Sequence, residues 1–185
     1  VADVVRPEAA AAIRGLAMAG IQHLVMLTGD NRGTANAVAG AVGIKDVRAE
    51  LLPEDKLKAI EEILEKYGAT AMVGDGVNDA PALAIASVGI AMGTKGSDAA
   101  IETADVALMT DDLLKLAWLV AHARRSLRVI RQNIYFALSV KVVFMILAML
   151  QMATLWMAIA ADMGSSLLVV FNALTLLNES SNKSR

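Results

Sequence analysis

The 185-residue chain contains no cysteine, which excludes disulfide bridges and thiolate metal sites within it and leaves its redox compartment undetermined. Histidine is scarce as well. His23 falls in an expected strand and His122 in an expected helix, so we interpret both as packing or surface residues. The formal net charge is only −2, which excludes a global electrostatic field that would attract nucleic acid.

Charge is nearly missing from the last third of the chain. Between residues 134 and 177 only Lys141 and Asp162 are charged, and hydrophobic residues make up 56% of the whole sequence. A soluble domain has about 45–50% apolar residues, so we expect the excess to lie in a membrane. About 44 residues in one helix would far exceed a hydrocarbon core of about 30 Å, which favours two spans of roughly 20 residues. We place the break between them near residues 151–154.

The orientation of this hairpin follows from the arginines that precede it. Four of them, Arg124, Arg125, Arg128 and Arg131, lie just before the first span and indicate the cytoplasmic side. Two crossings return the tail to that side. We therefore predict a cytoplasmic stalk helix at residues 111–131, two transmembrane helices at 132–178 and a cytoplasmic tail at 179–185.

Residues 1–110 alternate between short apolar runs and helical patterns. We expect helices at 7–18, 32–42, 53–67 and 78–86, a further short helix opened by Ser97 and Asp98, and strands at 21–27, 69–73, 88–92 and 106–109. This alternation predicts an α/β domain with a mostly parallel sheet covered on both faces. Ligands of such sheets bind at the carboxyl ends of the strands.

Two loops at strand ends or helix starts are candidates for phosphate binding. Residues 28–31 (Thr-Gly-Asp-Asn) follow a strand, and their hydroxyl and amides can bind phosphate oxygens, although an ordinary turn would have the same composition. Residues 53–56 (Pro-Glu-Asp-Lys) open a helix. Lys56 can reach a strand-end site and neutralise phosphate charge, or it can simply be solvated.

The string at residues 74–83, Gly-Asp-Gly-Val-Asn-Asp-Ala-Pro-Ala-Leu, carries more information. Asp75 and Asp79 lie four residues apart at a strand-to-helix turn and offer the hard oxygen ligands that Mg²⁺ prefers. Gly74 and Gly76 allow close backbone approach. The alternative is a helix N-cap with acidic residues favoured by the helix dipole. The complete string after a strand favours the metal site.

These three segments, in this order, resemble the second half of the phosphorylation domain of P-type ATPases, and residues 3–7 (Asp-Val-Val-Arg-Pro) resemble the segment that follows its nucleotide-binding insertion. The resemblance implies a haloacid-dehalogenase-like, Rossmann-type fold and an aspartyl-phosphate intermediate. It also implies the role of each site residue. Thr28 with Gly29 would bind the phosphoryl group, Asp30 would lie near it at a domain interface, and Lys56 would neutralise the phosphoaspartate. Asp75 and Asp79 would bind Mg²⁺ with Asn78 completing the site, and Gly74 and Gly76 would let the cofactor approach the backbone. Phosphoryl transfer depends mainly on such alignment and charge neutralisation.

The family's nucleophile, the aspartate of an Asp-Lys-Thr-Gly-Thr string, is absent from this sequence, as is its Thr-Gly-Glu motif. The chain begins with Val1 rather than methionine, which suggests a fragment. We therefore expect its partners to be the N-terminal parts of the same pump: the nucleotide-binding and actuator domains, which bind most of the ATP, and further transmembrane helices. The isolated chain is expected neither to autophosphorylate nor to pump.

Lys141 and Asp162 each lie roughly 12 Å inside their spans, at about eight residues of 1.5 Å. Ionisable residues near the bilayer centre are costly and usually functional. Two alternatives remain, snorkelling of Lys141 to the surface and a purely structural ion pair. Residues 133–177 resemble the last two spans of the zinc/cadmium/lead branch of heavy-metal P-type ATPases, which carry such a lysine and an Asp-x-Gly. The resemblance implies that Asp162 binds the transported Zn²⁺, Cd²⁺ or Pb²⁺ and that Lys141 is its built-in counter-ion.

The leading hypothesis is thus part of an ATP-driven zinc, cadmium or lead export pump, integral to a bacterial plasma membrane with its soluble part cytoplasmic. A copper-type pump is an alternative, because Met163, Ser165 and Ser166 partly echo the Met-x-x-Ser-Ser pattern of copper pumps. A membrane-anchored phosphatase would need an Asp-x-Asp nucleophile, which is absent. A non-catalytic accessory or truncated chain associated with a complete transporter is the third alternative.

Overall fold

The computed structural model describes residues 5–75, 79–93 and 102–182. The chain divides into two compact units, residues 1–120 and 121–185.

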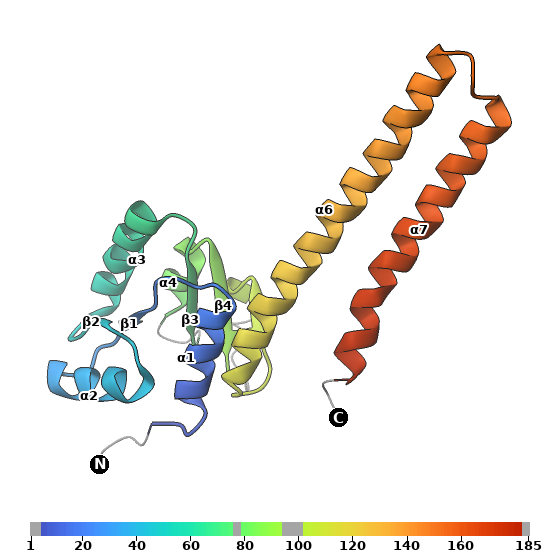
Figure 1. Ribbon diagram of the computed structural model, residues 1–185. Coiled ribbons are helices and arrows are strands. Elements are labelled where there is room, and N and C mark those ends of the chain that lie inside the picture. Colours follow the sequence, from blue (N-terminus) through green and yellow to red (C-terminus); the bar gives the residue numbers. More distant parts are fainter. Residues whose placement is uncertain (1–4, 76–78, 94–101, 183–185) are drawn as a thin grey trace. The chain divides into compact units, whose positions relative to one another are not determined.

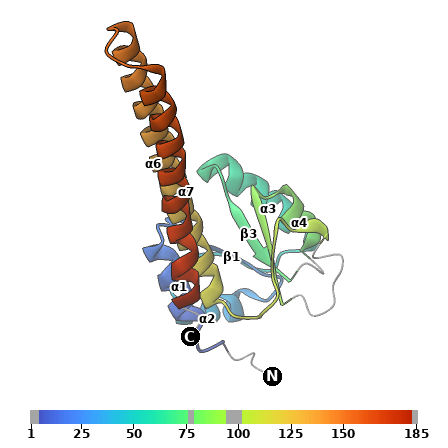
Figure 2. The same ribbon diagram turned by 90° about the vertical axis from the view of Figure 1, so that its right-hand side faces the viewer.

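The first unit alternates helices with parallel strands, which confirms the predicted α/β class. Its elements are α1 (Ala9–Met18), β1 (Val25–Leu27), α2 (Arg32–Val42), β2 (Asp46–Arg48), α3 (Pro53–Tyr67), β3 (Ala71–Gly74), α4 (Ala80–Ile85), β4 (Val88–Met92) and β5 (Val106–Leu108). Figures 1 and 2 both show the strands between α1 and α2 on one side and α3 and α4 on the other. Helices therefore cover both faces of the strands.

The strands form two sheets rather than one. β1 pairs with β2, and β3 pairs with β4, which pairs with β5. Within the described residues, β1 and β3 thus each have a strand on one side only. The apolar face of α3 spans the division, because Ile60, with Leu57 and Leu64 beside it, belongs to a cluster that includes both Met72 of β3 and Leu27 of β1. The two sheets therefore lie under the same helix.

Local sequence signals account for the bounds of the long helices in this unit. The side chain of Asn31 accepts a hydrogen bond from the Thr34 amide at 2.9 Å, which caps the start of α2. Gly43 ends this helix with a φ of 88°, a backbone conformation that glycine adopts without strain. α3 begins at Pro53 and ends before Gly68, as predicted.

Several expectations differ from the structure in their bounds or fall outside it; β3 covers 71–74 rather than 69–73, and α6 begins at Leu114 rather than at 111. β1 covers only residues 25–27 of the strand expected at 21–27, and β2 was not predicted. β2 contains one apolar residue, Val47, between Asp46 and Arg48, so its sequence gives no strand pattern. The helix expected from Ser97 lies outside the described residues.

The second unit is a helical hairpin. α6 (Leu114–Met149) begins in the first unit and passes residue 132 without a break, because it contains neither proline nor glycine. α7 (Leu155–Asn182) follows a turn in which Gln151 has a φ of 56°. Both helices are long and apolar enough to cross a membrane, and α6 and α7 lie side by side (Figure 1). This confirms the predicted hairpin, with its break at the expected place.

Candidate functional site

The loop after β1 holds the hydroxyl of Thr28 by local hydrogen bonds. Thr28 Oγ1 donates to the Asp30 carboxylate at 3.0 Å, and the Asp30 amide donates back to Thr28 Oγ1 at 3.1 Å. Gly29 lies close to the chain before α3, since a Cβ added to it would lie 3.3 Å from the Leu51 carbonyl oxygen. A larger residue between Thr28 and Asp30 would therefore crowd the Leu51 carbonyl.

Backbone hydrogen bonds tie this loop to the start of α3. The Leu51 amide donates to the Thr28 carbonyl at 3.1 Å, and the Glu50 amide donates to the Asp30 carbonyl at 2.9 Å. Glu50 has a φ of 61°, which is uncommon for a residue with a side chain, and its carboxylate accepts from the Arg32 amide at 3.3 Å. The loop at residues 28–31 is thus fixed beside the first turn of α3.

Lys56 extends from the beginning of α3 to the turn before α4. Its Nζ lies 2.6 Å from Asp79 Oδ1, and the two side chains are 18% and 16% exposed. Charges this far removed from water are stable only when they are paired. Although Asp79 occupies the N-cap position of α4, its side chain makes no capping hydrogen bond. Its carboxylate therefore pairs with Lys56 and does not cap the helix.

Gly74 makes room for that carboxylate at the end of β3. A Cβ on Gly74 would come within 3.0 Å of Asp79 Oδ2, and Asp75 is the next residue along the chain. Asn78 and Gly76 lie outside the described residues, as do Asp3 and Val4 of the N-terminal segment. The described part of this strand-to-helix turn thus contains two carboxylates, those of Asp75 and Asp79.

Asp75 and Asp79 do not make a complete metal site by themselves. Among the described residues no group of three or more His, Cys, Asp and Glu side chains could hold a metal alone. Mg²⁺ is commonly bound through one or two carboxylates together with water and substrate phosphates. The carboxylates at this turn fit Mg²⁺ held jointly with a phosphate, and they do not fit a complete protein cage.

The three motifs singled out in the sequence are therefore joined by a continuous chain of contacts. Loop 28–31 bonds to residues 50 and 51, α3 follows directly, and Lys56 of α3 bonds to Asp79 beside the end of β3. The sequence did not reveal the Lys56–Asp79 bond, because it depends on how α3 packs on the sheet. A phosphate near this edge would meet a hydroxyl, loop amides and an ammonium.

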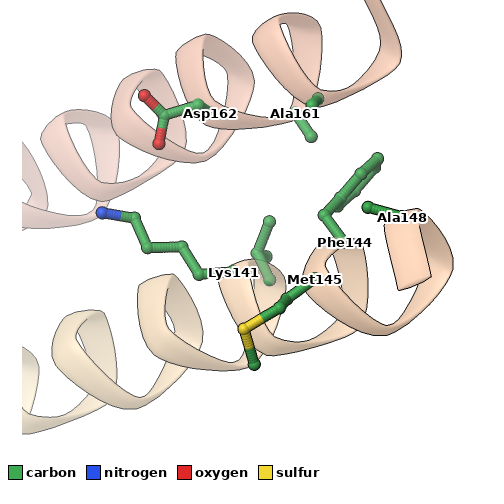
Figure 3. A pocket seen from close by; sticks show the side chains of 8 residues that line it. Lys141, Phe144, Met145, Ala148, Ala161 and Asp162 are labelled. Atoms are coloured by element: carbon green, nitrogen blue, oxygen red, sulfur yellow. The ribbon is translucent and has the colours of Figure 1, made fainter. Parts of the chain in front are cut away.

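The hairpin brings Lys141 and Asp162 to one cleft. The cleft has a volume of about 340 Å³ and is otherwise lined by Val140, Phe144, Met145, Ala148, Ala158 and Ala161. Figure 3 shows the two charged side chains extending toward each other from α6 and α7. Both belong to the described part of the chain, and there they form no ion pair within 4.0 Å. Opposite charges thus face each other across open space.

The two serines that partly match the copper-type pattern make hydrogen bonds within α7. Ser165 Oγ and Ser166 Oγ donate to the Asp162 carbonyl at 3.0 and 2.9 Å. Such bonds to the preceding turn are a usual arrangement for helical serines. Gly164 makes no close helix contact within the hairpin, since a Cβ there would meet nothing within 4 Å.

Sequence reasoning missed the polar contacts that Asn133 makes between the two helices. Asn172 Nδ2 donates to Asn133 Oδ1 at 2.7 Å. The signal was present, because amide side chains in an otherwise apolar span often bond across helices. His23, interpreted as a packing residue, stacks on the ring of Tyr67 at 4.1 Å.

Known proteins resemble both units. Residues 1–87 match the family model of haloacid dehalogenase-like hydrolases. The probable cadmium-transporting ATPase of Alkalihalophilus pseudofirmus is 52% identical over 96% of this chain and 24% of that protein. The zinc/cadmium/lead-transporting P-type ATPase of Escherichia coli is 48% identical over 95% of this chain and 23% of that protein.

Solved structures agree. The crystal structure of a zinc-transporting PIB-type ATPase in an E2.Pi state has a TM-score of 0.86 and 47% identity, covering 95% of this chain and 28% of that one. A 3-deoxy-D-manno-octulosonate 8-phosphate phosphatase from Moraxella catarrhalis, 20% identical with a TM-score of 0.51 over 63% of this chain and 75% of that one, shows the fold alone.

A haloacid-dehalogenase-like domain joined to a charged membrane hairpin defines a segment of an integral membrane P-type ATPase. More narrowly, the chain belongs to the heavy-metal-transporting P-type ATPases of the zinc/cadmium/lead branch, and it corresponds to their C-terminal portion. It spans about a quarter of the length of the relatives it matches. The resemblance seen in the motifs is thereby confirmed.

Proposed function

We propose that this chain supplies two half-sites of an ATP-driven zinc, cadmium or lead export pump. One is the Mg²⁺- and phosphate-binding half of the phosphorylation site, and the other is the Asp162 and Lys141 part of the membrane metal site. The observation that carries the proposal is the Lys56–Asp79 bond of 2.6 Å, joined through α3 to loop 28–31. We further propose that the soluble part lies in the cytoplasm of a bacterial cell, on the side of the arginines before the hairpin.

In the soluble half-site, Asp75 and Asp79 would hold Mg²⁺, with Asn78 as a further ligand implied by the family pattern. Bound there, Mg²⁺ would neutralise developing charge on the phosphate oxygens. Thr28 Oγ1 and the amides around Gly29 would donate to those oxygens. Lys56 bonds to Asp79 in this structure, and its ammonium would turn to the phosphate when one enters.

The division of the strands into two sheets supports the proposal that a strand from another part of the pump carries the nucleophile. β1 and β3 are each paired on one side within the described residues, and both contribute to the cluster under α3. A strand between them would end at the same edge as Thr28 and Asp75, where parallel sheets bind their ligands. We propose that another part of the pump provides this strand with its phosphorylated aspartate, and that further parts bind ATP.

In the membrane half-site, Asp162 would bind the transported divalent cation. A carboxylate without a partner in hydrocarbon is costly, and the Lys141 ammonium across the cleft would offset that cost when no cation is bound. The cleft between the two side chains leaves space for the cation. Relatives named as cadmium, zinc, cobalt or lead transporters favour a divalent soft or borderline metal as the cargo.

The test is made in the complete pump that contains this chain, reconstituted in proteoliposomes. Asp162→Ala should abolish zinc-stimulated ATP hydrolysis, and Asp75→Asn should block phosphoenzyme formation even with zinc present. Asp46→Asn, which removes a carboxylate from β2 instead, is the matched control and should behave as the wild type. Wild-type zinc stimulation in Asp162→Ala would refute the ligand role of Asp162.

A second test uses the chain alone. Incubated with Mg²⁺ and ATP labelled on its γ-phosphate, the 185-residue chain should yield no acid-stable acyl phosphate, because it lacks the nucleophile motif. Labelling that survives acid quenching but is lost in hydroxylamine would contradict this part of the proposal. The complete pump, treated in parallel, is the positive control.

A further inference from the structure

Two amide side chains connect the helices of the hairpin. Asn172 Nδ2 on α7 donates to Asn133 Oδ1 on α6 at 2.7 Å, and Asn133 Nδ2 donates to the Val169 carbonyl on α7 at 3.4 Å. Both amides are half-buried. Asn133 therefore both accepts and donates a hydrogen bond across the interface between α6 and α7 (the seam), whereas Asn172 acts as a donor there.

The amides lie on the same seam as the Lys141–Asp162 cleft. From Asn133 to Lys141 is eight residues, about 12 Å along α6, and from Asn172 back to Asp162 is ten residues, about 15 Å along α7. Val140 and Ala161 of the cleft lie seven residues after Asn133 and eleven before Asn172, close to two and three helical turns, so each amide is near the face of its own helix that lines the cleft. The turn at residues 150–154 lies on the other side of the cleft. The cleft is thus bounded by the turn at one end and by the amides at the other.

The side chains between the turn and the amide pair do little to fix the spacing of α6 and α7. Lys141 and Asp162 make no direct ion pair in the described hairpin, and the other residues that line the cleft are apolar or small. Lipid is as apolar as such residues, so apolar contacts hold helices together weakly and tolerate sliding or rotation. An amide that is half-buried between the two helices and loses its partner leaves polar atoms with fewer hydrogen bonds, so the bonded arrangement of the amides is favoured.

We propose that the Asn133–Asn172 pair is an amide clamp that fixes the spacing and register of α6 and α7, and so positions Asp162 opposite Lys141. Both asparagines act as positioning residues, because they act through the helices rather than on the cation. The clamp's effect on transport rests on the proposed function of Asp162. Its effect on helix geometry does not, and the two can be measured separately.

The geometry is measured on the whole chain in lipid nanodiscs. Because the chain has no cysteine, spin labels can be attached at Leu138→Cys and Leu167→Cys alone; both positions are exposed and lie between the clamp and the cleft. Pulsed electron resonance should give a single narrow distance distribution. The double variant Asn133→Leu/Asn172→Leu leaves no unsatisfied amide, so it should still insert, but its distribution should broaden or become bimodal.

Two further variants separate the clamp from a general loss of polarity. Asn172→Gln keeps a donor at the end of a longer side chain and should retain much of the narrow distribution. Thr175→Ala is the matched control. The Thr175 hydroxyl donates to the Asn172 carbonyl within α7, so this variant loses a polar group without losing a hydrogen bond between the helices. An unchanged distribution in the double leucine variant would overturn the clamp.

The transport consequence is measured in the complete pump, with Asp162→Ala assayed alongside. The double leucine variant should raise the zinc concentration for half-maximal ATP hydrolysis about tenfold, while phosphorylation by inorganic phosphate without zinc stays near the wild-type level. A broadened distribution with wild-type zinc affinity, where Asp162→Ala is inactive, would overturn the positioning role. Wild-type stimulation in Asp162→Ala would instead overturn the proposed function, and the distance measurement would still decide the clamp.

Discussion

Replacing Lys56 by methionine tests whether the ammonium and Mg²⁺ compete for the same carboxylate. The change removes the charge from Asp79 and keeps most of the aliphatic stem in place. In this structure the Asp79 carboxylate bonds to Lys56 at 2.6 Å. Any Mg²⁺ that binds there must displace the ammonium or share the carboxylate with it. The substitution should therefore strengthen Mg²⁺ binding.

The size of the effect follows from the geometry of the pair. At 2.6 Å and an effective dielectric constant of about 20, the gross attraction is about 6 kcal/mol. Desolvation offsets most of it, because the side chains are only 18% and 16% exposed. Hydrogen bonds to charged groups contribute about 1.5–3 kcal/mol net. With about 1.4 kcal/mol for each factor of ten, Mg²⁺ affinity should rise roughly ten- to hundredfold.

Isothermal titration of Mg²⁺ into the whole chain in nanodiscs, at fixed ionic strength, measures the change. Lys58→Met is the matched control, because Lys58 is exposed on the same helix and two residues away, so it faces elsewhere. An equal gain in both variants would show a general charge effect. Unchanged affinity in Lys56→Met would refute the competition, and with it the assignment of Asp79 to the Mg²⁺ site.

Three substitutions test the packing and capping of the α/β unit by hydrogen exchange in the whole chain. Gly89→Ala should destabilise β4 by about 1–3 kcal/mol, because the new Cβ would lie 2.7 Å from the Leu83 carbonyl oxygen; wild-type protection of β4 would contradict this. Gly40→Ala should instead stabilise α2 by about 0.5–1 kcal/mol, since its Cβ would meet nothing within 4 Å. Asn31→Ala should cost about 1 kcal/mol and expose the Thr34 amide, whose acceptor it removes; faster exchange confined to other helices would argue against the cap.

The parts of the fold that could be predicted are those with strong local signals. α3 has a proline at its start, a glycine after its end and an apolar stripe, and each signal is independent of the rest of the molecule. β2 could not be predicted, because Val47 is its one apolar residue and its strand form depends on pairing with β1. Likewise, no sequence pattern shows that β1 and β3 belong to separate sheets in the described residues, since strand pairing is set by the tertiary fold.

The candidate site divides in the same way. Residue types and spacing pointed to Lys56, Asp75 and Asp79, but the bond between Lys56 and Asp79 joins elements 23 residues apart and depends on tertiary packing. Asn133 and Asn172 gave a weaker signal still. An asparagine in a span predicts some polar partner, and only the register of two antiparallel helices identifies which one.

Both proposed cation sites pair a carboxylate with a lysine, and the difference between the pairs bears on how each site would work. At the soluble site the ammonium is in contact with Asp79, so it would lower Mg²⁺ affinity until phosphate draws Lys56 away. Binding of Mg²⁺ and phosphate would then be mutually supportive. At the membrane site Lys141 stays beyond 4.0 Å from Asp162, across a cleft of about 340 Å³. The carboxylate would be partly neutralised but not occupied, so a cation could enter without first breaking a bond. A change in the spacing of α6 and α7 that brought Lys141 into contact would then favour release, and the amide clamp is the contact that such a change must strain.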